Sequence, residues 1–412
     1  MNCPSAPAFA QPAQTPRTGG GASAPLILVY TDDPERGGVA QYNHALLLAL
    51  AGSGYRVACA QAPSSSPLIG AQMAAGVDHH WLPYDAQGST FRRSLEDMAT
   101  PRMLFELTRP ALVIFSDCCP VSNLAARHAA MALRIPFVVV IGFVAEYLAK
   151  SAGSYLGPLS RHYAAAREVI AVSDENLRLL RSHFGLAADR GRVVHYGRPP
   201  EFFAPRDPAR RAQLRSELGV PADAVVSLTA ARLTPLKGYR HQIAAMERLE
   251  AGGALAKSFF VWLGEGEERA SLEREIRRKG WGRLVALPGH RWNMAEWYDL
   301  ADLYVLPSES EGMPLSIMEA MAKSLPVIAS AISGIPEELG PCGRLIPDPK
   351  AHPEEASREM ARTIRLWTED PDLRRAAGDA CHDRAGLFFR ESTMIQRTLE
   401  IVARSAPVPA PG

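Results

Sequence analysis

The sequence predicts an α/β protein with two Rossmann-like, doubly wound domains that face each other across a cleft. Short, uninterrupted apolar runs alternate with helical patterns through most of the 412 residues, a length too great for one ordinary core. One proline-rich segment, GRPPEFFAPRDP at residues 197–208, divides this alternation into two series. Uninterrupted apolar runs are typical of strands in a parallel sheet that is covered on both faces.

The first series begins at residue 26, after a stretch rich in Pro, Ala, Gly and Ser that we expect to be disordered. Residues 26–31 (LILVYT) form the first predicted strand, and residues 39–54 form a predicted helix that ends at glycine. Further strands are predicted at residues 55–61, 111–116, 137–142, 168–173 and 192–197, with a helix at 121–133. Strands that alternate with helices indicate βα units and therefore a parallel sheet.

The second series follows the proline-rich segment, which we interpret as a hinge between the domains. Its predicted strands are residues 224–231, 258–264, 283–289, 302–307 and 325–330. Residues 388–405 have the pattern of an amphipathic closing helix. The predicted organisation is a disordered tail at residues 1–24, a first domain at 25–198, a second domain at 199–385, and a closing helix with a flexible tail at 386–412.

The composition favours a cytoplasmic protein and argues against nucleic-acid binding. The formal net charge is +1, and the basic residues are scattered along the chain. No apolar run approaches the roughly 18 residues that span a bilayer, and the N-terminus lacks the pattern of a signal peptide. The six cysteines have no metal-ligand spacing, so we expect reduced thiols. Some arginines border apolar residues and leave peripheral contact with an anionic membrane open; they are Arg92, Arg93, Arg102 and Arg109.

Two turns of the second domain combine positive charge with glycine. Arg232 and Lys237 follow the predicted strand 224–231, whereas Gly264 ends the predicted strand 258–264 and Gly266 follows it. If the strands are parallel, both turns lie at the carboxyl edge of one sheet, where open α/β sheets bind ligands. Cationic side chains, free backbone amides and helix N-termini there favour an anionic ligand such as a diphosphate.

A third turn, after the predicted strand 302–307, carries two carboxylates, Glu311 and Glu319. Carboxylates repel phosphate, but they accept hydrogen bonds from hydroxyl groups, as an acidic residue does from the ribose of a nucleotide. A diphosphate with a hydroxyl-rich group at each end is a nucleotide sugar. We therefore expect one carboxylate to face each sugar of such a ligand.

Structural roles for these acids are the alternatives. Ser316 and Glu319 have the spacing of a capping box, and Glu311 could serve only as an acid near a helix N-terminus. The acidic pair Asp370 and Asp372 lies between helical stretches, so we expect a helix N-cap there and not a metal site.

With these motifs in place, the chain resembles the retaining glycosyltransferases of family 4, which have the GT-B fold. The matching stretches are VVHYGRPPEFFAP, ARLTPLKG, LGEGEE and the long run from VALPGHRWNMAEW to SGIPEEL. The family's Glu, seven residues, Glu pattern is met by Glu311 and Glu319. The resemblance covers most of residues 25–405 and is strongest over residues 193–338.

The resemblance implies a role for each residue. Arg232 and Lys237 would hold the donor diphosphate and stabilise it as the leaving group, Glu311 would bind the transferred sugar, and Glu319 would bind the ribose. The remaining implied donor contacts are Gly37 and Gly38 from the first domain, the glycine turn with Gly264 and Gly266, and the backbone of Gly312, Met313, Pro314 and Leu315. The family uses no metal and no cofactor, because cationic side chains take the place of a metal.

One position departs from the family pattern. Many members carry a histidine just after the strand represented here by residues 137–142, where this chain has Gly142 and Phe143. Glu146 is the nearest ionisable residue and the only candidate on the acceptor side.

The resulting prediction is a metal-independent, retaining glycosyltransferase that moves a sugar from a nucleotide diphosphate sugar to a glycan, a lipid-linked glycan or a small molecule. Two alternatives keep the same fold: a non-catalytic nucleotide-sugar-binding protein and a nucleotide-sugar epimerase. The motifs do not specify the nucleobase of the donor, its sugar or the acceptor.

Overall fold

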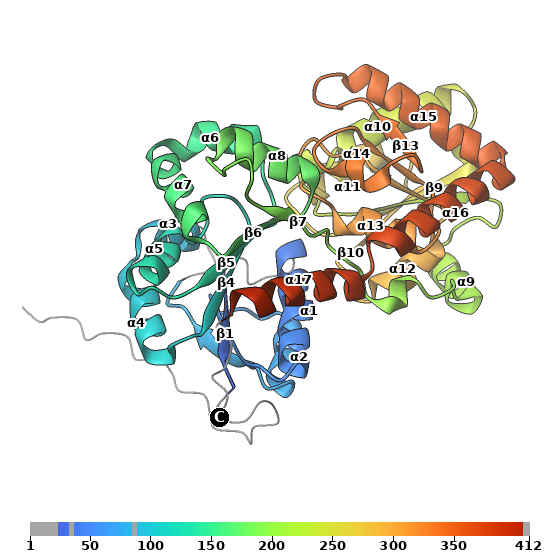
Figure 1. Cartoon of the computed structure of the whole chain (residues 1–412). Helices are drawn as coiled ribbons and strands as arrows, with labels where there is room; N and C mark the ends of the chain where they lie inside the picture. Colours follow the sequence, from blue (N-terminus) through green and yellow to red (C-terminus); the bar gives the residue numbers. More distant parts are fainter. Residues whose placement is uncertain (1–23, 33–36, 85–88, 407–412) are drawn as a thin grey trace, which may run out of the picture. The chain divides into compact units, whose positions relative to one another are not determined.

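The structure is a computed structural model of the chain, and it describes residues 24–32, 37–84 and 89–406 (Figure 1). The chain divides into two compact units. The second unit comprises Tyr196–Glu391, and the first comprises the residues up to His195 together with those from Ser392 onward. The predicted domain boundary lay between residues 198 and 199, within a few residues of the division between the two units.

The first unit contains a seven-stranded parallel sheet in the order β3-β2-β1-β4-β5-β6-β7. Its strands are β1 (Leu26–Thr31), β2 (Arg56–Gln61), β3 (Asp78–Trp81), β4 (Leu112–Asp117), β5 (Phe137–Ile141), β6 (Glu168–Ala171) and β7 (Arg192–Val193). Its helices are α1 (Gly38–Gly52), α2 (Leu68–Ala74), α3 (Ser89–Glu96), α4 (Ala99–Thr108), α5 (Leu124–Ala132), α6 (Glu146–Ala152), α7 (Leu156–Ala165), α8 (Asp174–His183) and most of α17 (Glu391–Ser405). Helices lie on both faces of this sheet (Figure 1), which is why β1 and β4 are buried along their whole length.

The second unit contains a six-stranded parallel sheet in the order β10-β9-β8-β11-β12-β13. Its strands are β8 (Val225–Ala230), β9 (Ser258–Leu263), β10 (Val285–Gly289), β11 (Leu303–Leu306), β12 (Val327–Ser330) and β13 (Arg344–Ile346). Its helices are α9 (Pro208–Glu217), α10 (Tyr239–Ala251), α11 (Arg269–Arg278), α12 (Met294–Leu300), α13 (Leu315–Ala322), α14 (Ile335–Leu339), α15 (Pro353–Glu369) and α16 (Pro371–Phe388).

The strand order reverses once in each sheet. In the first unit the reversal lies between β1 and β4, and in the second it lies between β8 and β11. A crevice outside the carboxyl ends of two such strands is the usual ligand position in an open α/β sheet. The prediction of two doubly wound, parallel α/β domains is confirmed by both sheets.

Some predicted elements differ in extent from the observed ones. Strand β7 has two residues instead of the predicted six, and the backbone amide of Val194 just after it donates to the carbonyl oxygen of Ala171 in β6. The helix predicted over residues 121–133 begins only at Leu124, since Asn123 adopts a left-handed conformation with φ 54°. The short strands β3 and β13 were not predicted, nor were individual helices such as α2, α3, α4, α6, α7 and α8.

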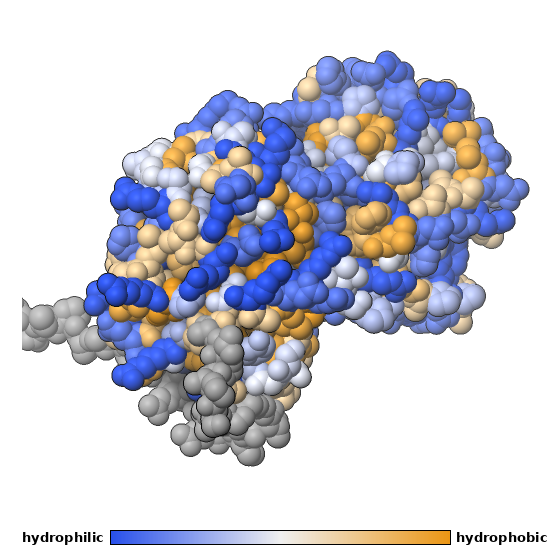
Figure 2. Space-filling model, viewed as in Figure 1, coloured by the Kyte–Doolittle hydropathy of each residue, from blue (hydrophilic) through white to orange (hydrophobic). Residues whose placement is uncertain are grey.

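Several smaller predictions can be checked in the described residues. Asp370 is the N-cap of α16 and accepts hydrogen bonds from the backbone amides of Asp372 and Leu373, at 3.1 and 2.9 Å, as predicted. The described cysteines, which exclude Cys3, are all free thiols. Of the helices that the structure describes, none is long and apolar enough to cross a bilayer. On the face shown in Figure 2, hydrophilic residues predominate and apolar residues form separate patches.

Candidate functional site

The carboxyl edge of the second unit's sheet brings the predicted turns together. Strand β8 pairs in parallel with β9 on one side and with β11 on the other. The turns after β8, β9 and β11 carry Arg232 and Lys237, Gly264 and Gly266, and Glu311, in that order. They therefore follow three adjacent strands at one edge, and the reversal of strand order lies among them.

Glycine at position 238 allows the turn after β8 to approach the end of β11. Arg232 is exposed, Leu233 beside it is fully buried, and Lys237 ends a short 3₁₀ turn, Pro235–Lys237. Gly238 follows with φ 73°, and a Cβ atom there would lie 1.9 Å from the carbonyl oxygen of Pro307. No other residue type fits at this position without moving one of the two turns.

The glycine turn after β9 packs against the turn after β8. A Cβ atom on Gly264, whose φ is 141°, would lie 2.0 Å from the carbonyl oxygen of Ala231. A Cβ atom on Gly266 would lie 2.3 Å from the carbonyl oxygen of Leu233. Contact between two backbone segments of the protein therefore accounts for both glycines, and their predicted contact with a donor stays a prediction.

Lys237 and Glu311, two of the predicted catalytic residues, form an ion pair. The Lys237 Nζ atom lies 2.6 Å from Glu311 Oε1, and the two side chains are 17% and 8% exposed. The hydroxyl of Ser308 also donates to Oε1, at 2.7 Å. Among the described residues Oε2 of Glu311 has no hydrogen-bond partner, so this oxygen remains able to accept from a hydroxyl group.

Helix α13 begins directly after the Glu311 turn. Its N-cap is Pro314, and no side chain caps it. Met313 is buried, and the carbonyl oxygen of Gly312 accepts from the backbone amide of Gly334 at 3.1 Å, which fixes the turn. The uncapped N-terminus offers backbone N–H groups and the positive end of the helix dipole to an anion.

The capping-box alternative for Glu319 is wrong. Ser316 lies inside α13, one residue after its start, so Glu319 is too far along the helix to close a box with it. Instead the buried carboxylate pairs with Arg198, with Nη2 2.9 Å from Oε1, and accepts from the hydroxyl of Tyr298 at Oε2, 2.8 Å away. Burial raises the pKa of Glu319, and the charge of Arg198 opposes that rise.

Two further ionisable groups belong to this edge and were not predicted. Glu309 accepts from Arg240 at 2.6 Å and lies 2.9 Å from Nε2 of His241, and its backbone amide donates to the carbonyl oxygen of Leu236. Glu338 on α14 is completely buried, and burial, followed by the charge of Glu311, raises its pKa well above the usual range. Glu309 lies two residues before Glu311 in the same turn, but no sequence pattern marks Glu338 as buried.

Arg198 and Tyr298 are the site residues that sequence reasoning missed. Arg198 lies in the segment predicted as the hinge, and its guanidinium carbon is 4.9 Å from the centre of the Phe202 ring. The available signal was an arginine among prolines and phenylalanines, where a buried cation requires an acidic partner. Tyr298 lies on α12 and is fully buried.

The remaining predicted residues belong to the first unit. Gly37 is the exposed N-cap of α1 and Gly38 is the first residue of that helix. Glu146 starts α6, is 61% exposed, and pairs with Lys150 at 3.5 Å. No described contact of these three residues tests their predicted roles.

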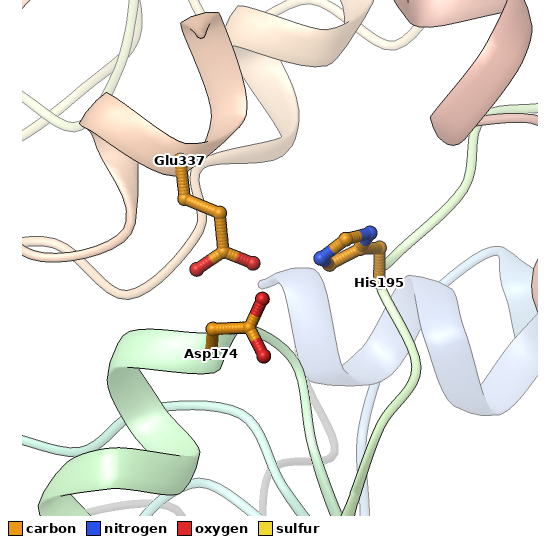
Figure 3. Close-up of side chains that lie close together, drawn as sticks. All are labelled: Asp174, His195 and Glu337. Atoms are coloured by element: carbon orange, nitrogen blue, oxygen red, sulfur yellow. The ribbon is translucent and has the colours of Figure 1, made fainter.

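Figure 3 draws three side chains that could ligate a metal. Asp174 starts α8 and His195 follows β7 in the first unit, whereas Glu337 lies on α14 in the second. Because these ligands come from different units, we assign no metal site to them.

Two family models match the chain. The model described as "Glycosyltransferase Family 4" matches residues 36–202, and the model described as "Glycosyl transferases group 1" matches residues 210–383. Together they span both units and include every predicted site residue of the second unit.

Curated relatives share part of the sequence. D-inositol 3-phosphate glycosyltransferase of Streptomyces coelicolor is 31% identical over 252 residues, which are 56% of this chain and 53% of the relative. Alpha-maltose-1-phosphate synthase of Mycolicibacterium smegmatis is 30% identical over 247 residues, covering 58% of this chain and 63% of the relative. The chain thus spans about half the length of the curated relatives it matches.

Solved structures share the fold over most of both chains. HepE of Anabaena in complex with UDP-glucose has a TM-score of 0.76 and 19% identity, with 92% of this chain and 100% of that chain covered. Sucrose-phosphate synthase of Thermosynechococcus elongatus has a TM-score of 0.74 and 20% identity, with 92% and 98% covered. With both family models and this fold, the chain belongs to the group 1 glycosyltransferases and has their GT-B fold.

Proposed function

We propose that the protein transfers a sugar, with retained anomeric configuration and without a metal, from a nucleotide diphosphate sugar to a glycan, a lipid-linked glycan or a small-molecule acceptor. The observation that carries this proposal is the Lys237–Glu311 pair, which is mostly buried and lies where the strand order reverses. The names of the relatives and the UDP-glucose bound to HepE support the reaction class.

The Lys237–Glu311 pair can contribute to binding of both parts of the donor, the diphosphate and the sugar. Lys237, the exposed Arg232 and the uncapped N-terminus of α13 supply positive charge for a diphosphate, and they would stabilise it as it leaves. Glu311 receives both of its hydrogen bonds at Oε1. Its Oε2 atom can therefore accept from a hydroxyl group of the sugar that is transferred.

Metal independence is proposed because cationic side chains occupy the place where a metal would otherwise neutralise the diphosphate. Retention is proposed from the family resemblance, with a phosphate oxygen of the donor receiving the proton of the acceptor. Contact of Arg92 and Arg102 with anionic lipid also stays a prediction. In the structure these two arginines are exposed and pair with Glu96 and Glu106, respectively.

The experiment is a donor panel without acceptor. UDP-, GDP-, ADP- and dTDP-sugars are incubated with the protein, with and without EDTA, and release of the nucleotide is followed by mass spectrometry. We expect slow hydrolysis of one donor that survives EDTA. It should fall by about a hundredfold or more in Lys237→Met and in Glu311→Gln, because removing one electrostatic contact to a transition state has effects of this size.

A matched control is Arg278→Met, which removes an exposed arginine of the same unit that pairs with Glu275 outside the site. This variant should hydrolyse the donor at the wild-type rate. Thermal stabilisation by a donor without any turnover, even when acceptors are supplied, would favour the non-catalytic binding protein. Loss of turnover in EDTA would overturn the proposed metal independence.

A further inference from the structure

We infer that Arg198 is a positioning residue for Glu319, and that the two together make the donor site select ribonucleotides over 2′-deoxyribonucleotides. This inference rests on the proposed function, because it takes Glu319 as the group that binds the ribose. This selectivity would disfavour sugar donors that contain a deoxynucleotide such as dTDP.

The first support is the geometry of the carboxylate. Arg198 engages Oε1 of Glu319 at 2.9 Å, and the hydroxyl of Tyr298 engages Oε2 at 2.8 Å. A carboxylate has about four lone-pair positions, two on each oxygen. One bond on each oxygen fixes the plane of the carboxylate and leaves an acceptor position on each. Two such positions side by side suit the adjacent 2′ and 3′ hydroxyl groups of a ribose.

The second support is the rigidity of Arg198. Its backbone amide donates to the carbonyl oxygen of Phe389 at 2.8 Å, and its own carbonyl oxygen accepts from the amide of Glu391 at 2.9 Å. Its guanidinium lies over the ring of Phe202, and that ring packs edge-on against Tyr298 at 6.1 Å. Arg198 is 7% exposed. A cation held in this way keeps the carboxylate in one orientation.

The third support is charge. Glu319 is buried, with 5% of its surface exposed, and burial is the largest influence that raises its pKa. Arg198 opposes this rise most strongly, followed by the hydrogen bond from Tyr298, whereas the charge of Glu201 adds to the rise. The buried hydroxyl of Tyr304 also faces this carboxylate. Without Arg198 the carboxyl group would take up a proton at a higher pH and lose one of its acceptor positions.

A purely structural role for the Arg198–Glu319 pair predicts a different result. If the Arg198–Glu319 pair only holds α13 against the segment around Phe202, then its loss lowers stability and weakens all nucleotides equally. If Arg198 positions a ribose-binding carboxylate, then its loss weakens ribonucleotides more than deoxyribonucleotides. Its loss should also make this selectivity depend on pH.

The test measures dissociation constants for UDP and 2′-deoxy-UDP by calorimetry at pH 6, 7 and 8.5, using the full chain. If the donor panel identifies another base, the matching ribo and deoxyribo diphosphates are used. For the wild type we expect UDP to bind about tenfold to a hundredfold more tightly than its 2′-deoxy form, as is usual for a hydrogen bond to a charged group. Arg278→Met serves as the surface control and should keep this ratio.

In Arg198→Met the ratio should fall, most strongly at pH 6, because without the opposing cation burial favours the protonated carboxyl group, and it should recover as the pH rises to 8.5. In Glu319→Gln the ratio should be low at every pH, because an amide does not titrate. Arg198→Lys keeps the charge and should retain most of the selectivity. If Arg198→Met does not fold, as judged by circular dichroism, Arg198→Lys and Glu319→Gln carry the test.

The outcomes separate the two proposals. If the wild type binds none of UDP, GDP, ADP and dTDP, the proposed function fails and the inference falls with it. If it binds dTDP alone, only the inference fails. If the wild type binds a nucleotide but does not discriminate against its 2′-deoxy form, only the inference fails. It also fails if a folded Arg198→Met keeps the wild-type ratio at all three pH values, or if Glu319→Gln keeps it.

Discussion

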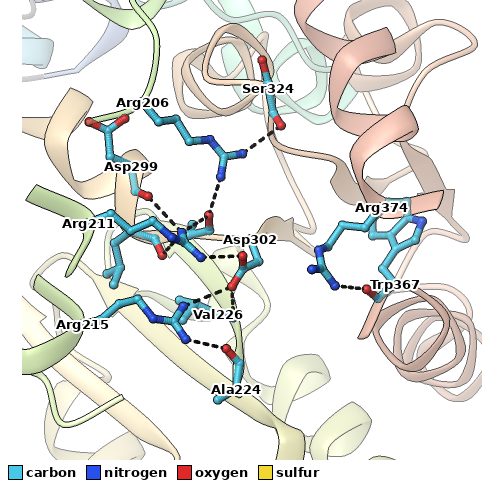
Figure 4. A network of polar contacts seen from close by, with 12 residues as sticks. Arg206, Arg211, Arg215, Ala224, Val226, Asp299, Asp302, Ser324, Trp367 and Arg374 are labelled. Atoms are coloured by element: carbon cyan, nitrogen blue, oxygen red, sulfur yellow. Dashed lines mark hydrogen bonds and ion pairs between the residues drawn. The ribbon is translucent and has the colours of Figure 1, made fainter. Parts of the chain in front are cut away.

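Arg206 joins three backbone carbonyl groups at the end of the helix that carries Glu319, and its removal should destabilise the second unit. Its guanidinium donates to the carbonyl oxygen of Lys323 at 2.9 Å. It also donates to those of Ser324 at 2.9 Å and Ala301 at 3.0 Å (Figure 4). Lys323 is the C-cap of α13, so its bond satisfies a carbonyl group that the helix leaves without a partner, and the bond to Ser324 holds the residue that follows the helix. The change that tests this role is Arg206→Met, which keeps the apolar stem of the side chain.

The structure sets the size of the effect. The carbonyl oxygen of Ala301 keeps a second donor, Arg211, at 2.9 Å, so the substitution deprives only Lys323 and Ser324 of their bonds to Arg206. Hydrogen bonds from charged donors contribute about 1.5–3 kcal/mol each. Arg206 is half-buried, so water can replace part of the loss. We therefore take the lower end and expect a loss of about 2–3 kcal/mol.

Urea unfolding followed by tryptophan fluorescence suits this prediction, because most of the tryptophans report on the second unit. That unit holds Trp262, Trp281, Trp292, Trp297 and Trp367, and only Trp81 lies in the first. With a slope of about 2–3 kcal/mol per molar urea, the midpoint should fall by about 1 M. Arg278→Met should leave the midpoint unchanged. A shift for Arg206→Met no larger than that of this control would refute the reasoning.

Two further predictions concern the same unit. Gly238→Ala should lower the free energy of unfolding by about 3 kcal/mol or more and abolish nucleotide binding, because its Cβ would collide with Pro307 in a left-handed backbone conformation. Gly253→Ala is the control: Gly253 has φ 72° and nothing lies within 4 Å of the added Cβ. It has only the left-handed strain, so we expect a loss of about 1 kcal/mol. Equal losses in urea unfolding would contradict this. Glu338→Gln should match the wild type in melting temperature at about pH 4, below the ordinary pKa of glutamate, and exceed it at about pH 8. The raised pKa of Glu338 means that its stabilising effect is present below the unfolded-state pKa and is lost as pH rises toward the folded-state value. A difference in melting temperature between the two proteins that stays the same at every pH would contradict this prediction.

The sequence was sufficient for the features that follow from local pattern. Uninterrupted apolar strands predicted parallel sheets, and parallel strands placed Lys237 and Glu311 at one edge, where they form a direct ion pair. Arg198 could not be found in this way. Its partner Glu319 is distant along the chain, and nothing in the local sequence of either residue specifies the other. Glu338 was missed for a related reason, because glutamate is almost never fully buried and the hydrophobic pattern gives no sign of an exception.

The structure also accounts for carboxylates in a turn that is proposed to bind an anion. The negative charge of each of the three buried acids, Glu311, Glu319 and Glu338, is compensated or suppressed in a different way. Glu311 pairs with Lys237 and Glu319 pairs with Arg198. The Glu338 carboxylate forms no ion pair with any described residue; burial raises its pKa well above the usual range, the charge of Arg384 only partly opposes this, and the neutral acid is favoured. None of the three therefore contributes a full uncompensated negative charge to the edge of the sheet. The exposed Arg232 and the uncapped N-terminus of α13 remain as uncompensated positive features. The same edge can thus offer hydroxyl acceptors and still attract the proposed diphosphate.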